Sequence, residues 1–129
     1  MSIPVEIPVG DFLDKLSILE IKSERIQDPD KLANIRRELE VLRATWKASP
    51  YVHSDITAEY AELKTVNESL WDIEDHIRDQ ERLRDFGERF IELARSVYLT
   101  NDRRAEIKRA INLKLGSALV EEKSYREYR

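Results

Sequence analysis

Cysteine is absent from this chain of 129 residues. Its absence excludes a disulfide framework, thiolate metal ligands and a thiol nucleophile. Long apolar runs are also missing: no hydrophobic run exceeds three residues, so no segment is able to span a bilayer. Without such a run there is no signal-peptide core either, and we expect a cytoplasmic protein that does not insert into membranes.

Basic charge is also in short supply. The chain has 22 Lys and Arg against 26 Asp and Glu, a net charge of -4, whereas a nucleic-acid binder needs a basic surface. We therefore expect no nucleic-acid partner. Three glycines and four prolines leave few helix breakers, and the remaining composition favours helices. The length suits one core, so residues 1–129 are predicted to form a single helical domain.

An extended arm is predicted over residues 1–9. Pro4 and Pro8 bracket an alternating segment, and the residue before a proline is pushed out of the helical region. An arm of this kind has no strand to pair with in a helical chain. It would lie across the helices or pair with a second subunit.

The first predicted helix begins at Gly10 or Asp11 and ends near Gln27. Its apolar residues fall on two opposite sides, with Phe12, Leu16, Leu19 and Ile26 on one and Ile18 and Ile21 on the other. A helix that is apolar on both sides is typically central and is contacted by several neighbours.

A second helix is predicted after Asp28, which suits the N-cap and is followed by proline at the first helical position. Its apolar residues recur at spacings of three and four: Leu32, Ile35, Leu39, Leu42 and Trp46. We expect it to pair antiparallel with the first helix. A third helix is predicted from a cap at Ser54 or Asp55 to about Arg84.

The fourth helix is predicted to begin at 85–87 and to end at Gly116, a suitable C-cap. Thr100–Asn101–Asp102 could instead be a break with a fresh N-cap, although one long helix is favoured. Residues 117–129 are predicted to be a solvated tail anchored by Leu119, Tyr125 and Tyr128. The chain is thus predicted to be an all-α antiparallel bundle of about four helices, the last two long, with an extended N-terminal arm.

Polar residues interrupt the apolar stripes of three helices. The third helix carries a ridge at spacings of four, three and four, formed by Asn67, Trp71, Glu74 and Arg78. In the fourth helix the stripe of Phe90, Leu93 and Val97 continues in polar residues. If the helices pack side by side, the misplaced residues converge in mid-bundle beside Trp71, and they are Glu20, Asn67, Glu74, Asn101, Arg104 and Lys108.

Two interpretations of this polar set are open. Buried charges must be paired or they cost several kcal/mol each, so the set could be a structural network or the seam of an oligomer. Equally, Arg104 and Lys108 could present cations to an anionic ligand, since arginine offers a fork for carboxylate or phosphate.

Metal and cofactor chemistry has little support in the sequence. His53 and His76 are far apart, and the acidic residues beside His76 favour a solvated helix face. Glu59 and Glu62 have the spacing of one acidic pair of helical nucleotide pyrophosphatases, but the second pair is not clearly present. No glycine-rich loop is available for phosphate. We predict no metal and no cofactor.

Three stretches together resemble a known family: residues 7–22, 66–78 and 90–104, and the ending 116–125 is similar as well. The chain resembles a family of short, single-domain bacterial proteins catalogued only as a domain of unknown function. The resemblance implies that the recognisable motif residues are Asp14, Glu20, Asn67, Trp71, Glu74, Asn101, Asp102 and Arg104. Most of these are the residues that interrupt the apolar stripes.

We expect a cytoplasmic helical binding or assembly module, forming a homodimer, whose mid-bundle polar cluster recognises an anionic ligand or a partner. One alternative is a small all-α enzyme acting on a phosphorylated or nucleotide-sugar metabolite. In that case Glu20 or Glu74 would be the acid or base, and Arg104 and Lys108 would hold the substrate. A second alternative is a purely structural homodimer.

Overall fold

The structure is a computed structural model that describes residues 2–128. Met1 and Arg129, the outer ends of the predicted arm and tail, lie outside the described residues. The chain forms four helices: α1 (Val9–Arg25), α2 (Pro29–Lys47), α3 (Thr57–Arg82) and α4 (Glu88–Leu115). No strand occurs within residues 2–128. The all-α prediction is confirmed, and the last two helices are the longest, at 26 and 28 residues.

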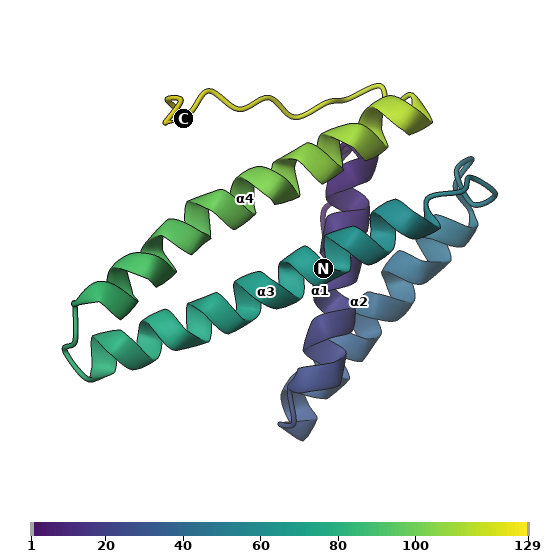
Figure 1. The fold of residues 1–129 in the computed structure, drawn as a ribbon. Helices are drawn as coiled ribbons and strands as arrows, with labels where there is room; N and C mark the ends of the chain where they lie inside the picture. Colours follow the sequence, from purple (N-terminus) through teal and green to yellow (C-terminus); the bar gives the residue numbers. More distant parts are fainter. Residues whose placement is uncertain (1, 129) are drawn as a thin grey trace.

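The four helices make two antiparallel hairpins that cross each other (Figure 1). α1 contacts each of the other three helices, whereas α2 contacts α1 alone among the helices. The prediction that the first helix is central is therefore confirmed. α1 crosses the hairpin of α3 and α4 at a steep angle, and the joined ends of α3 and α4 extend beyond it (Figure 1).

The core surrounds α1, which contributes buried residues on more than one side. Leu13, Leu16 and Leu19 lie in this core, where burying each aliphatic side chain contributes roughly 1.5–3 kcal/mol. The other three helices supply Leu39, Leu63, Ile107 and Ile111. Phe12 and Trp46 pack against this cluster from its edge.

The helix ends follow the sequence signals in most cases. The Asp28 carboxylate accepts hydrogen bonds from the amides of Asp30 (2.9 Å) and Lys31 (3.3 Å), and the helix then begins at Pro29. α4 runs unbroken through residues 100–102, as favoured, and ends at Gly116, whose φ of 65° suits glycine. α3 begins later than expected, after Ile56, with no side-chain cap.

The two ends of the chain have no regular secondary structure. Residues 2–8 form an extended arm in which Ile3 and Val5 remain exposed. Residues 117–128 form a tail that turns back after α4 and runs beside it (Figure 1). Within residues 2–128, no helix is both long enough and apolar enough to cross a membrane.

Candidate functional site

A buried polar cluster joins α1, α3 and α4 around Asp14. Arg104 binds both carboxylate oxygens of Asp14, through Nε to Oδ1 at 2.9 Å and through Nη2 to Oδ2. Asn67 donates from Nδ2 to Asp14 Oδ1 (2.9 Å) and also contacts the Ser17 hydroxyl. Asp14, Ser17 and Asn67 are all buried. Two-point binding by arginine is the strong form of this contact, so the cluster locks three helices together.

The Asp14 carboxylate also affects its partner. The pKa of Arg104 is raised because of its hydrogen bonds to Asp14, although partial burial opposes the shift. The polar groups of Asp14 and Asn67 are therefore hydrogen-bonded within the fold. This closed pairing favours a structural role for this part of the predicted polar set.

A close helix crossing lies one turn before Asp14. The Gly10 amide donates to the Asn112 side-chain oxygen at 2.6 Å, and a Cβ built on Gly10 would stand 2.4 Å from the Lys108 carbonyl oxygen. Only glycine lets the backbones of α1 and α4 approach this closely. Asn112 is 2% exposed, and its backbone oxygen also accepts from the amide of Ser117.

Lys108 connects α1, α4 and the tail. Its Nζ lies 2.6 Å from Asp11 Oδ1 and 2.9 Å from Glu121 Oε2. Burial opposes the charge of Lys108, but the bonds to Asp11 and Glu121 outweigh it and raise its pKa. Hydrogen bonds from Lys123 and then from Lys108 lower the pKa of Glu121 to about 2. The tail is thus held to α4 by ion pairs.

Further contacts extend this attachment along the tail. Arg109 pairs with Glu122 at 3.1 Å, and the Tyr128 hydroxyl bonds to Asp102. The ring of Tyr128 packs edge-on against Tyr98, with 4.9 Å between centroids. The predicted anchors differ in part, because Tyr125 is 79% exposed and acidic side chains supply contacts instead.

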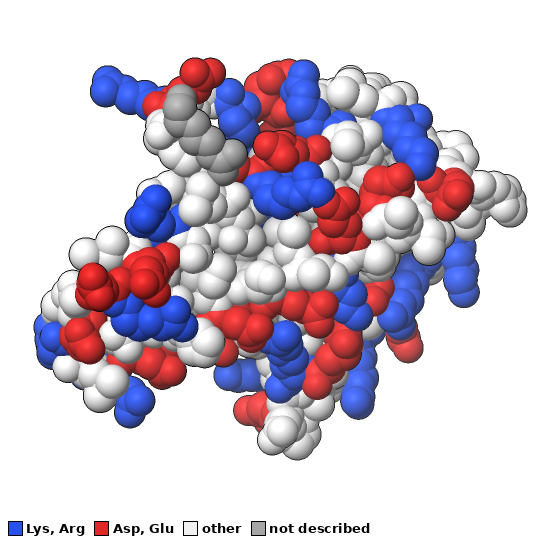
Figure 2. Space-filling model, in the orientation of Figure 1, with Lys and Arg blue, Asp and Glu red and all other residues white. Residues whose placement is uncertain are grey.

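An open groove of about 1110 Å³ lies between α4 and the tail. Four predicted ligand-binding residues line it: Asn101, Asp102, Arg104 and Lys108. The tail contributes further side chains to the lining: Lys123, Tyr125, Arg126, Glu127 and Tyr128. In Figure 2 basic and acidic side chains alternate along the upper edge of the molecule, where the tail runs beside α4.

Several hydrogen-bond donors of the groove are uncommitted. Among residues 2–128, neither Asn101 nor Arg126 has a hydrogen bond or ion pair, and Arg104 keeps Nη1 free of such contacts. The lining holds four cations against three acids, although the whole chain has fewer cations than acids. The groove therefore has the donors that an anionic group requires.

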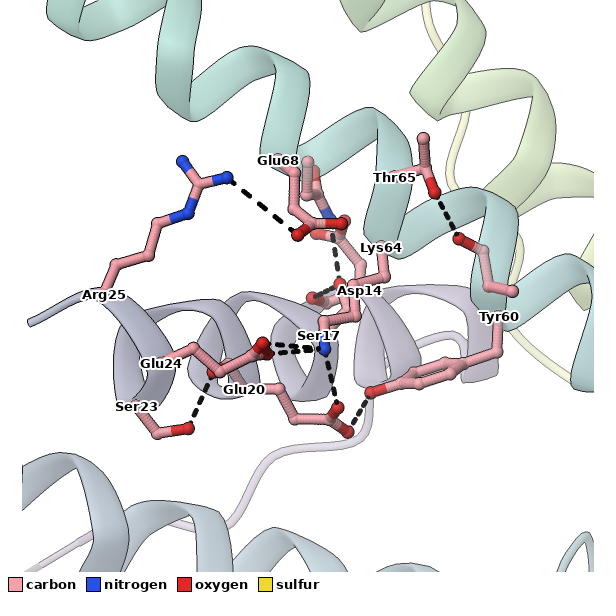
Figure 3. Close-up of polar contacts among 12 residues, drawn as sticks. Asp14, Ser17, Glu20, Ser23, Glu24, Arg25, Tyr60, Lys64, Thr65 and Glu68 are labelled. Atoms are coloured by element: carbon pink, nitrogen blue, oxygen red, sulfur yellow. Dashed lines mark hydrogen bonds and ion pairs between the residues drawn. The ribbon is translucent and has the colours of Figure 1, made fainter.

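Glu20 lies apart from this groove, on the contact between α1 and α3. Tyr60 reaches from α3 to bind Glu20, and Lys64 lies 3.5 Å from it and 2.5 Å from Glu24 (Figure 3). Burial, followed by the hydrogen bond to Glu20, raises the pKa of Tyr60. The bond to Glu24 is the largest cause that raises the pKa of Lys64.

Glu74 and Trp71 also fall outside the expected cluster. Glu74 pairs with Arg78 on the same helix at 2.5 Å, and both side chains are largely exposed. The guanidinium carbon of Arg25 lies over the ring of Trp71, 5.8 Å from the ring centroid. The expected convergence of six residues at one point is thus only partly present. The physical reason is the steep crossing of α1, because α3 continues beyond that crossing toward its turn with α4 (Figure 1).

The acidic pair considered for metal is bound to cations. Glu59 pairs with Lys114 at 2.8 Å, and Glu62 pairs with Arg103. Both of these cations lie on α4. Within the described part of the chain, no three His, Asp or Glu side chains gather closely enough to hold a metal ion.

Sequence reasoning missed Asn112 and the tail side of the groove. Asn112 directly follows the apolar residue Ile111, so the apolar period of α4 does not mark it as a helix contact. The available signal was Gly10 at the start of α1, because a glycine there allows another helix to approach closely. The tail residues have no helical or strand period. Without a period, a sequence pattern cannot indicate which side chains point toward α4.

Fold and groove together define a small all-α protein in which two crossed helical hairpins carry a C-terminal tail along the last helix. The chain matches the family of unknown function DUF6165 over residues 3–128, and it belongs to that family. No curated protein and no solved structure matches it.

Proposed function

We propose that this protein is a binding module that holds an anionic ligand in the groove between α4 and the tail. The supporting observation is the set of uncommitted donors, from Asn101, Arg126 and Nη1 of Arg104, that line one groove. Arginine and amide donors recognise phosphate or carboxylate oxygens. We further propose a cytoplasmic, bacterial setting, as the sequence and its resemblance lead us to expect.

The groove also suits a ligand with a ring attached to its charged group. Tyr98, Tyr125 and Tyr128 line it, and an aromatic surface can pack against a sugar or base ring. The volume of about 1110 Å³ slightly exceeds the usual range of ligand cavities, about 300–1,000 Å³, which favours a nucleotide-sized compound over an isolated phosphate.

Calorimetric titration with inorganic phosphate, a nucleoside diphosphate and a nucleotide sugar tests this proposal. We expect saturable binding of one of the organic phosphates, and a loss of about tenfold in affinity for the Asn101→Ala/Arg126→Ala variant. Arg95→Ala is the matched control, since Arg95 is an exposed arginine of α4 outside the groove lining. Absence of binding to any probe, or an equal loss in the control, would overturn the proposal.

A structural homodimer is the second candidate, favoured by apolar side chains at the joined ends of α3 and α4. Leu83, Phe86 and Ile91 are 64%, 48% and 55% exposed. Light scattering on the wild type and on Phe86→Ser/Ile91→Ser decides it. A wild-type dimer that the variant converts to monomer would support it, and a wild-type monomer would contradict it. The enzymatic alternative gains no such observation, because Glu20 and Glu74 lie outside the groove.

A further inference from the structure

A second cavity, of about 340 Å³, lies where the two ends of the chain meet the α1–α2 hairpin. Its walls are residues 5–7 of the N-terminal arm, Val9 and Phe12 at the start of α1, the end of α2 with the loop after it, and residues 117–119. The volume is at the small end of the range for ligand cavities.

Three aromatic rings line this cavity in a row. Phe12 and Trp46 have ring centroids 6.2 Å apart, and Trp46 and Tyr51 have centroids 6.5 Å apart, with interplanar angles of 19° and 21°. All three residues are half-buried. Rings at this separation are offset from one another, so each keeps surface that can contact a ligand.

The serine and threonine hydroxyls of the lining are already used within the fold. Ser49 donates to the Trp46 carbonyl at 2.7 Å, and Thr45 donates to the Val41 carbonyl at 2.9 Å. Ser117 donates to the Leu119 carbonyl at 2.6 Å and accepts from the amide of Val9 at 3.3 Å. These three hydroxyls hold the walls in place.

Glu6 is the only charged residue of the cavity lining within residues 2–128. Its carboxylate has no hydrogen bond or ion pair with another described residue. Glu6 is exposed and shares the lining with the aromatic rings, and its carboxylate attracts a cation. The rings themselves favour a cation whose charge is surrounded by methyl or methylene groups.

We propose that this cavity binds a small organic cation of the alkylammonium class, with the ammonium group against the rings of Trp46 and Tyr51 and near Glu6. This ligand differs in charge from the one proposed for the groove, and the two sites share no lining residue. The rings supply contact and cation–π attraction, and Glu6 supplies the opposite charge.

Choline and its neutral carbon isostere, in which a tert-butyl group replaces the trimethylammonium group, are the probes. Binding is followed by tryptophan fluorescence in a Trp71→Phe background, which leaves Trp46 as the one reporter. We expect choline to give a saturable change and the neutral isostere to bind at least about fivefold more weakly.

Glu6→Gln separates charge from shape in the same assay. We expect this variant to lose about fivefold in affinity for choline while its affinity for the neutral isostere stays unchanged. Glu40→Gln is the control, since Glu40 is exposed on α2 and lies outside the lining. Equal affinity of the wild type for the two probes, or no saturable change with choline, would overturn the proposal. An unaltered choline affinity in Glu6→Gln would also do so.

Discussion

The polar cluster around Asp14 and the groove between α4 and the tail are neighbours on α4, yet they differ in how their polar groups are satisfied. At Asp14 the partners are side chains of α3 and α4, and the carboxylate itself is buried. In the groove, Asn101 is exposed and has no hydrogen-bond partner among residues 2–128. Arg104 belongs to both, with two nitrogens on Asp14 and one facing no partner.

This difference separates two causes of polar residues on a predicted apolar stripe. A buried carboxylate is tolerated because its partners replace the water it has lost, so it specifies how helices meet. Exposed, unpartnered donors in a concave surface gain nothing for the fold and remain available for a ligand. Substitutions in the two regions should therefore affect different measurements.

Asp14→Ala should have the largest effect on stability. It leaves Arg104 without its carboxylate and removes one of the two acceptors of the Asn67 amide, so we expect a loss of about 3–5 kcal/mol in the free energy of unfolding. Urea unfolding followed by circular dichroism measures it. Glu74→Gln is the control, because it breaks an exposed pair with Arg78 and should cost less than about 0.5 kcal/mol. Similar losses in both variants would show that Asp14 does not lock the helices.

Gly10→Ala should have an intermediate effect. The new methyl group would meet the Lys108 carbonyl at 2.4 Å, so α1 must move away from α4 at an expected cost of about 1–3 kcal/mol. The matched substitution is Gly87→Ala, whose nearest neighbour is a side-chain oxygen of Asp85 at 3.3 Å. Thermal unfolding of the two variants compares them directly. A smaller loss at Gly10 than at Gly87 would contradict the close crossing.

Acidification should have the smallest effect on the fold and should act on the tail. The pKa of Glu121 falls from its ordinary value of 4.5 to about 2, so its contribution to tail docking is complete above about pH 4.5. That contribution is lost as the pH falls through about 2, where the carboxylate takes up a proton. Heteronuclear NOE values of the tail amides should fall over this interval.

Glu121→Gln provides the comparison for this titration. With no charge at position 121, the tail amides should already be mobile at neutral pH, and their NOE values should change little on acidification. The α4 amides should keep high values in both proteins until global unfolding. A wild-type tail that stays rigid at low pH, or a variant tail as rigid as the wild type, would contradict the ion-pair attachment.

The boundaries of α2 and α4 could be predicted from the sequence because they lie at residues with a strong local preference. Asp28 and Pro29 mark the start of α2, and Gly116 marks the end of α4. Helical periodicity also identified Asn67 and Arg104 as inward-facing. Such preferences depend only on neighbouring residues, so they can be recognised from the amino-acid sequence alone.

The angle between the hairpins could not be predicted in the same way. A helical wheel shows on which face of its helix a residue lies. It does not show along what length of that face a neighbouring helix makes contact. Glu74 shares a ridge of α3 with Asn67, but it pairs in solvent with Arg78 and not with α1. The crossing depends on contacts such as Gly10 against Lys108, which join residues about a hundred positions apart.

Asn112 connects the start of α1 with the chain segment that lines both the smaller cavity and the groove. Through its side chain and its backbone it holds both Gly10 at the start of α1 and Ser117 at the start of the tail. Residues 117–119 form a wall of the smaller cavity, and the same chain continues into the groove lining. When residues 117–119 are held in place, the rest of the tail loses less conformational entropy on packing against α4. A ligand that orders residues 117–119 would lower the entropy that the tail loses when a second ligand binds in the groove, and thermodynamic linkage would make that effect mutual.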